Sequence, residues 1–126
     1  MKTLILAATL ILSSLGAQAA EVLSATLDAA GKNILVDVSY GGGCKKHTFS
    51  LKVGGCLESY PVQCTAVLVE TIEGGVDFCE AIIFTTAKIS LKKAGLTDSY
   101  YKGASLKIVG DKNFRGETSQ ATVTLP

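Results

Sequence analysis

The chain has 126 residues, of which 48% are hydrophobic, and its 12 basic and 11 acidic side chains give a formal net charge of +1. The charges are spread along the chain without a run of either sign. A phosphate backbone or an anionic membrane surface requires clustered lysine and arginine, so the composition predicts no nucleic-acid binding and no attachment to a membrane surface. The lysine pairs 45–46 and 92–93 are interpreted as solvated faces.

The first nineteen residues have the pattern of a secretory signal peptide. Lys2 supplies the positive charge, an apolar stretch covers residues 4–15, and Ala17-Gln18-Ala19 is a small-x-small cleavage site. The apolar stretch is about a dozen residues long, too short to cross a bilayer of ~30 Å as a helix, so no membrane insertion is expected. We therefore predict a mature protein of residues 20–126, located in the periplasm or secreted.

The remaining sequence alternates apolar and polar residues with a period close to two, between turns that contain glycine, which is typical of β-strands. We expect the segment 91–103 to be a loop or a single short helical turn, because Gly95 and the paired tyrosines interrupt it. Seven or eight short strands predict one all-β domain over residues 20–126, an antiparallel β-sandwich or a small barrel. The predicted strands are 21–27, 33–40, 47–53, 65–72, 76–86, 88–91, 105–110 and 120–125.

Four cysteines, Cys44, Cys56, Cys64 and Cys79, are an even number in a small exported domain, which predicts two disulfides that hold the fold together. Three pairings exist, and loop-closure entropy separates their totals by only about 1 kcal/mol.

Geometry separates the pairings better. If residues 65–86 form a hairpin that turns on Gly74-Gly75, Glu70 lies opposite Cys79 and Cys64 lies roughly 20 Å further along the ladder. A disulfide requires Cα atoms within about 7 Å, which disfavours Cys64–Cys79. Two pairings remain: the nested one, Cys44–Cys79 with Cys56–Cys64, and the crossed one, Cys44–Cys64 with Cys56–Cys79. We favour the nested pairing, because we expect residues 56–64 to form a compact loop whose ends can meet.

Several short motifs resemble those of a set of small bacterial envelope proteins that have no established activity. The shared elements are a Gly-Gly-Cys-x2-His-x-Phe-x-Leu segment, a Pro-x-Gln segment and a later Cys-Glu ahead of an apolar strand. The resemblance covers roughly residues 38–91 and implies an exported protein in which Cys44 and Cys79 form the shared pair. This chain differs by also carrying Cys56 and Cys64 and by lacking a lipid-anchor cysteine. The matching residues are Gly42, Gly43, Cys44, His47, Phe49, Leu51, Pro61, Gln63, Cys79 and Glu80.

Three hypotheses arise at "YGGGCKKH", residues 40–47, which contains the only histidine: a metal ligand set, a catalytic nucleophile with its base, or the anchor of a disulfide beside a tight turn. Cys44 and His47 have a plausible metal-ligand spacing, but zinc needs four donors and disulfides would consume the thiols. A nucleophilic Cys44 with His47 as base would need a free thiolate and a third group that orients the base. We expect instead that His47 hydrogen-bonds a loop carbonyl or a carboxylate such as Glu80. The glycines are expected to turn the chain into the Cys44 bridge rather than to cradle a phosphate.

The sequence thus predicts a small, non-catalytic binding or structural protein of the bacterial envelope without a cofactor. Its partner would be an unidentified protein or small ligand. Exposed aromatic residues in loops often contact partners, so Tyr60, Pro61, Tyr100 and Tyr101 are the candidate binding residues. The alternative is an inhibitor of an extracytoplasmic lysozyme or protease, with residues 56–64 as the inserted loop. A metal-binding protein that uses Cys44 and His47 is the third hypothesis.

Overall fold

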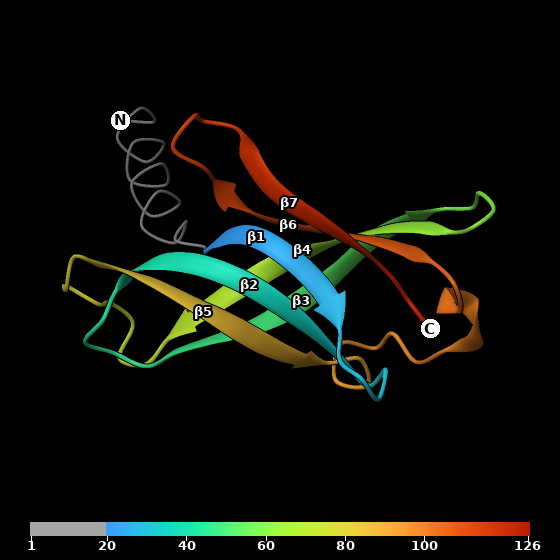
Figure 1. Cartoon of the computed structure of the whole chain (residues 1–126), viewed down its shortest axis with the longest axis horizontal. Coiled ribbons are helices and arrows are strands. Elements are labelled where there is room, and N and C mark those ends of the chain that lie inside the picture. The colour runs from blue at the N-terminus through green and yellow to red at the C-terminus, as the bar shows by residue number, and fades with distance from the viewer. Residues whose placement is uncertain (1–19) are drawn as a thin grey trace, which may run out of the picture.

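The computed structural model describes residues 20–126, so the predicted signal peptide lies outside the described residues. These residues form seven strands and one short 3₁₀ helix in two sheets (Figure 1). One sheet has the order β1-β2-β5 and the other the order β3-β4-β6-β7. The elements are β1 (Glu21–Leu27), β2 (Asn33–Gly42), β3 (His47–Leu57), β4 (Gln63–Ile72), β5 (Ala81–Ser90), η1 (Ser99–Tyr101), β6 (Ser105–Lys112) and β7 (Thr118–Thr124).

The alternating sequence pattern produces the core, because successive side chains of a strand point to opposite faces of its sheet. Inward-facing residues from both sheets meet in one hydrophobic cluster, and most of them are fully buried. The disulfide-stapled all-β fold is therefore confirmed, and it is a sandwich rather than a closed barrel. The largest fully buried side chains are Ile34, Val36 and Val38 from β2, Leu68 from β4, and Leu106 and Ile108 from β6.

On one side of the sandwich, hydrogen bonds connect the two sheets. The Ala20 carbonyl accepts the Asp111 amide, and the Ser119 hydroxyl accepts the Val22 amide and donates to the Asp111 carbonyl. A Cβ at Gly110 would lie only 2.6 Å from the Ala20 carbonyl oxygen, so glycine permits this close approach. On the other side, β3 and β5 each pair with a single neighbour and are both edge strands.

Two details of the predicted topology were wrong. The strand pairing is not wholly antiparallel, because β4 and β6 run parallel. Residues 65–86 do not form a hairpin either: β4 pairs with β3 and β6, whereas β5 pairs with β2 in the other sheet. Residues Val76–Glu80 cross between the sheets instead of extending a strand, and the predicted strand 88–91 is the end of the continuous β5.

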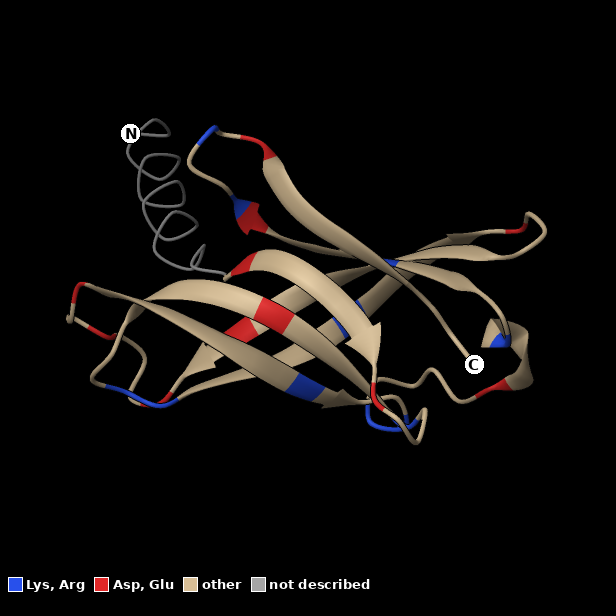
Figure 2. Ribbon diagram, viewed as in Figure 1, with Lys and Arg blue, Asp and Glu red and all other residues tan. Residues whose placement is uncertain are grey.

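Charged residues lie mostly at the strand ends and turns, with a few within the strands (Figure 2). Within residues 20–126, no helix has the length and apolar character needed to cross a membrane.

Candidate functional site

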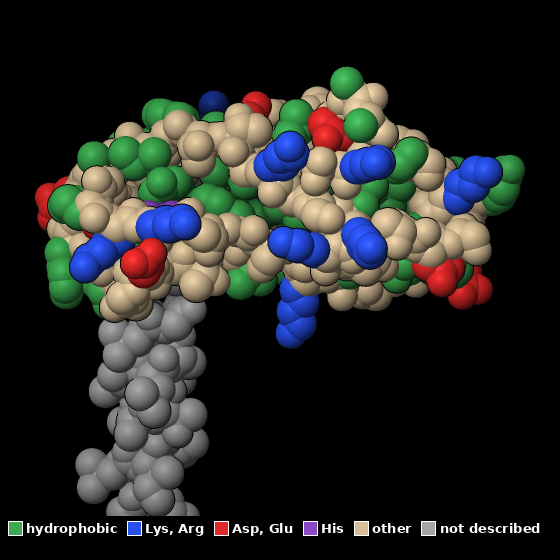
Figure 3. Space-filling model, turned by 90° about the horizontal axis from the view of Figure 1, so that it is seen from below, with side chains coloured by type: hydrophobic (Ala, Val, Ile, Leu, Met, Phe, Trp, Pro, Cys, Tyr) green, Lys and Arg blue, Asp and Glu red, His purple; other side chains and the backbone are tan. Residues whose placement is uncertain are grey.

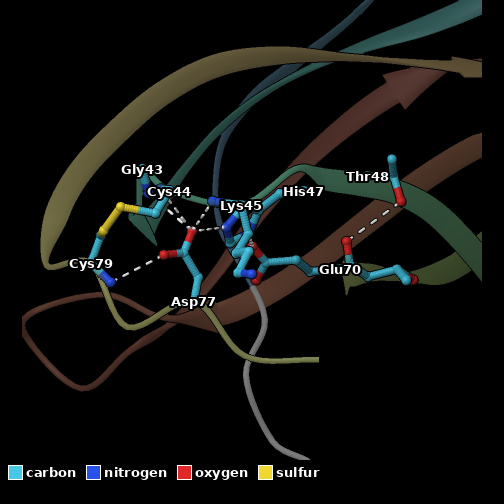
Figure 4. A network of polar contacts seen from close by, with 9 residues as sticks. Gly43, Cys44, Lys45, His47, Thr48, Glu70, Asp77 and Cys79 are labelled. Atoms are coloured by element: carbon cyan, nitrogen blue, oxygen red, sulfur yellow. Dashed lines mark hydrogen bonds and ion pairs between the residues drawn. A yellow bond between two sulfur atoms is a disulfide. The ribbon is translucent and has the colours of Figure 1, made fainter. Parts of the chain in front are cut away.

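The single histidine lies between two carboxylates where β3 begins (Figure 4). The Nδ1 atom of His47 lies 2.5 Å from Oε2 of Glu70 on the neighbouring strand β4, and its Nε2 atom lies 2.7 Å from Oδ2 of Asp77 in the crossing segment. The His47 side chain is fully shielded from solvent, and those of Glu70 and Asp77 are 4% and 1% exposed. The Tyr40 ring stacks on the imidazole with centroids 4.2 Å apart.

The Asp77 carboxylate also organises the glycine-rich loop. Its Oδ2 atom accepts the backbone N–H groups of three consecutive residues, Gly43, Cys44 and Lys45, and its Oδ1 atom accepts that of Cys79. Successive backbone N–H groups that converge in this way form an anion-binding nest. The loop therefore does cradle an anion, but the anion is the protein's own aspartate.

Glycine is required at the base of this nest. Gly42 has a φ of 152°, and a Cβ there would lie 2.5 Å from Asp77 Oδ2 and 2.8 Å from His47 Nε2. Gly43, at a φ of 112°, is also in a region that favours glycine. At Gly41, by contrast, a Cβ would meet nothing within 4 Å. The glycines thus admit the carboxylate and the imidazole as well as turning the chain.

A disulfide between Cys44 and Cys79 closes the same loop, with Cα atoms 5.8 Å apart. The second disulfide joins Cys56 and Cys64, which face each other across the β3–β4 ladder. This is the nested pairing. Two disulfides in a small domain are typical of an oxidising compartment outside the cytoplasm.

The electrostatics favour a charged histidine. Burial acts to lower the pKa of His47, but hydrogen bonds with Asp77 and Glu70 and the charges of both carboxylates raise it above its ordinary value of 6.5. The hydrogen bond from His47 is the main cause that holds the pKa of Asp77 well below its ordinary value, and the loop N–H groups act in the same direction. Because both ring nitrogens face carboxylate oxygens, the imidazolium donates to both.

These two shifts have opposite consequences for stability. The raised pKa of His47 means that its contribution is complete below pH 6.5 and is lost as the pH rises through the folded-state pKa. The lowered pKa of Asp77 means that its contribution is complete above its ordinary value of 3.8 and is lost as the pH falls through the folded-state pKa. The cluster therefore stabilises the fold most between about pH 4 and 6.5.

This arrangement confirms that Cys44 anchors a disulfide and that His47 hydrogen-bonds a carboxylate. The carboxylate partners are Glu70 and Asp77, however, so the choice of Glu80 was wrong. Neither ring nitrogen is left to accept a proton from a substrate, and the Cys44 sulfur is bonded to Cys79. What the cluster does chemically is hold the loop, the crossing segment and the start of β3 together.

Donor atoms of Cys44, Asp77 and Cys79 lie within 4.8 Å of one another, as a metal site would need. The two sulfurs are bonded to each other, however, and metals bind the thiolate form. The Asp77 oxygens are already engaged by backbone N–H groups and by His47. Metal binding would therefore require reduction of the disulfide and a rearranged loop.

The candidate partner-binding residues fall in two neighbouring places at the other end of the sandwich. Tyr60 is fully exposed and Pro61 is exposed, both in the loop closed by Cys56–Cys64. Tyr100 is 42% exposed, and its ring meets that of the half-buried Tyr101 edge to face at 5.2 Å. Burial raises the pKa of Tyr100, and the nearby carboxylate of Glu58, from the Tyr60 loop, adds to this shift.

Sequence reasoning missed two features near the start of β5, beside the His47 cluster. Asp77 was not singled out, although its place two residues before Cys79 and after the Gly74-Gly75 turn could have marked it as a turn residue. The exposed side chains of Phe78, Ile82 and Phe84, which are 87%, 71% and 69% accessible, were expected to belong to a paired hairpin strand.

Comparisons with known proteins give no match: no family model, no curated protein and no solved structure is similar to this chain.

Proposed function

We propose that this chain is a small exported protein of the bacterial envelope that acts by binding a partner protein rather than by catalysis. The observation that carries the proposal is the exposed first half of β5. Five of the six residues 81–86 are exposed, whereas the second half of the strand alternates normally, with Ala87 and Ile89 buried. The two exposed large side chains in this half, Ile82 and Phe84, lie on the same face of the strand.

The backbone of β5 is also available. The strand pairs with β2 along its whole length, and within residues 20–126 it has no hydrogen-bonded neighbour on its other side. Such an edge can accept an added strand, with main-chain hydrogen bonds supplying affinity and alternate side chains supplying specificity. We infer that the partner contributes an extended segment with apolar side chains that cover Ile82 and Phe84.

The site described above holds this edge in place. Cys79 and Asp77 immediately precede β5, and they are joined to the β2–β3 loop by the disulfide and by three hydrogen bonds. A binding strand whose start is already fixed loses less conformational entropy when a partner binds. The disulfide and the hydrogen bonds of Asp77 therefore support a binding role without contacting the partner themselves.

The charges beside this surface favour a basic partner segment. A cavity next to the start of β5 is lined by the carboxylate residues Glu70, Asp77, Glu80 and Asp111. Glu80 and Asp111 are exposed, whereas the carboxylates of Glu70 and Asp77 are engaged by His47. A lysine or arginine next to the apolar residues of the partner would pair with the two exposed carboxylates.

Site-specific photo-crosslinking in the periplasm tests this proposal. A benzophenone amino acid at position 84 should give one discrete protein adduct. The same probe at Val67, 49% exposed on the outer face of the other sheet, should give none. Ile82→Lys should remove the adduct formed from position 84. Equal adducts from positions 84 and 67, or an adduct insensitive to Ile82→Lys, would contradict a β5 interface.

A second candidate is an inhibitor of an extracytoplasmic lysozyme or protease. The observation in its favour is the loop closed by Cys56–Cys64, which carries Tyr60 fully exposed and Leu57 at 69% exposure. A short disulfide-closed loop with exposed apolar side chains suits insertion into an enzyme cleft, because its shape is fixed before binding. Inhibition at micromolar concentration that Tyr60→Ala abolishes would support this function, and no inhibition of any lysozyme or protease in a panel would refute it.

A further inference from the structure

Lysines from separate segments gather on the open side of the sandwich, at the end of β5 that lies away from the His47 cluster. Lys88 is in β5, Lys92 and Lys93 follow that strand, and Lys32 is in the β1–β2 turn. Lys52 on β3 lies two residues beyond Ser50, on the same face of its strand. The fold thus places lysines that are scattered along the sequence on one side of the molecule. We refer to these five residues as the lysine surface.

The positive charge of this surface is largely uncompensated. None of the five lysines forms an ion pair within 4 Å in residues 20–126, and each is exposed. The carboxylate of Asp28 in the β1–β2 turn interacts electrostatically with Lys88, so it offsets one of the five positive charges, and it also accepts the Asn33 side-chain amide. Figure 3 shows this face of the molecule, on which most of the charged side chains are lysine or arginine.

Four of the five lysines line cavities. A cavity of about 180 Å³ between β3 and β5 is lined by Ser50, Lys88 and Lys93, and a second of about 460 Å³ by Lys32, Asn33 and Lys92. Both are lined by Ser90, so the two cavities adjoin, and we refer to them together as the groove. The larger one is within the range of ~300–1,000 Å³ of small-ligand sites. Two serines and an asparagine thus line the same cavities as the lysines.

We propose that this groove binds a carbohydrate chain that bears sulfate or phosphate groups. The ammonium groups pair with the anionic substituents, and the hydroxyls of Ser50 and Ser90 and the amide of Asn33 hydrogen-bond sugar hydroxyls. The site is separate from the apolar half of β5, and the proposal does not depend on the function proposed above.

The composition of the groove favours such a chain over two other polyanions. None of the large hydrophobic residues that are exposed in residues 20–126 lines the groove, so it has nothing to insert into a lipid bilayer. Binding of single-stranded nucleic acid relies on aromatic side chains on which bases stack. The one aromatic residue in the groove, Phe49, is half-buried and packs against the core.

The test measures binding of a heparin oligosaccharide to the purified protein by calorimetry at low salt, with neutral dextran as the control ligand. We expect heparin to bind and dextran not to bind. Lys88→Gln/Lys92→Gln/Lys93→Gln should weaken heparin binding roughly tenfold and lower its salt dependence. The matched variant Lys45→Gln/Lys46→Gln/Lys112→Gln removes the same charge elsewhere and should stay within about twofold of the unmodified protein.

Chemical shifts provide a readout that needs no variant. Titration of the unmodified protein with the oligosaccharide should shift the amide signals of Ser50 and Ser90 and leave those of the His47 cluster in place. Absent heparin binding, an equal loss in the two lysine variants, or unchanged binding in the groove variant would overturn the proposal. Tighter binding to anionic phospholipid vesicles or to a single-stranded DNA oligonucleotide than to heparin would also overturn it.

Discussion

Removal of the Cys44–Cys79 disulfide should destabilise the protein more than removal of Cys56–Cys64. The first bridge spans a sequence separation of 35 residues and the second a separation of 8. Loop-closure entropy gives about 3.8 kcal/mol for the longer loop and about 2.5 kcal/mol for the shorter one. The difference should grow further, because Cys44 and Cys79 also fix the N–H groups that bind Asp77.

Urea unfolding of Cys44→Ala/Cys79→Ala and Cys56→Ala/Cys64→Ala measures this difference directly. A cost near 4 kcal/mol is a large part of the ~5–15 kcal/mol that stabilises a typical domain, so the first variant should be close to unfolding at 37 °C. Hydrogen exchange should also rise in the first half of β5 in that variant alone. An equal cost for both bridges, or a larger cost for Cys56–Cys64, would refute the reasoning.

Three further changes address the cluster and its support. The free energy of unfolding of the unmodified protein should be greatest between about pH 4 and 6.5 and decline above that range. His47→Gln should abolish the decline, because glutamine does not titrate. An unchanged pH profile in this variant would contradict a charged histidine. Gly42→Ala should cost roughly 1–3 kcal/mol, because its Cβ would strike the Asp77 carboxylate at a φ of 152°, whereas Gly41→Ala should be nearly neutral; equal costs by thermal unfolding would contradict this steric account. Ser119→Ala should cost about 1–3 kcal/mol by urea unfolding, because it leaves the buried Val22 N–H unpaired, and a neutral effect would contradict this hydrogen-bond account.

The strands and the core could be predicted from the sequence because both follow from the period-two pattern. Val36 and Val38 alternate with polar residues in β2, and they are buried as the pattern requires. The pairing of the strands could not be predicted in the same way. The Gly74-Gly75 turn looks like a hairpin turn, but whether the next strand pairs with β4 or crosses to the other sheet depends on contacts with residues distant in the sequence.

The candidate site shows the same limit. His47 and Cys44 were recognisable from the sequence because they are rare and close together. Glu70 and Asp77 are two of eleven acidic residues, and only the register of β3 with β4 and the course of the crossing segment bring them to the imidazole. The lysine surface arises in the same way, since its residues come from β3, from the end of β5 and from the β1–β2 turn, which are far apart in the sequence.

The central claim is that the cluster of His47, Glu70 and Asp77 stabilises the fold and is not a reactive centre. An NMR titration of the His47 ring nitrogens in the oxidised protein tests this claim most directly. A structural role requires an imidazolium that keeps both protons at pH 6.5, a His47 pKa above that value, and slow exchange of both ring N–H groups. A neutral ring at pH 6.5, with one nitrogen free and in rapid exchange with solvent, would contradict the account and indicate a histidine available for chemistry.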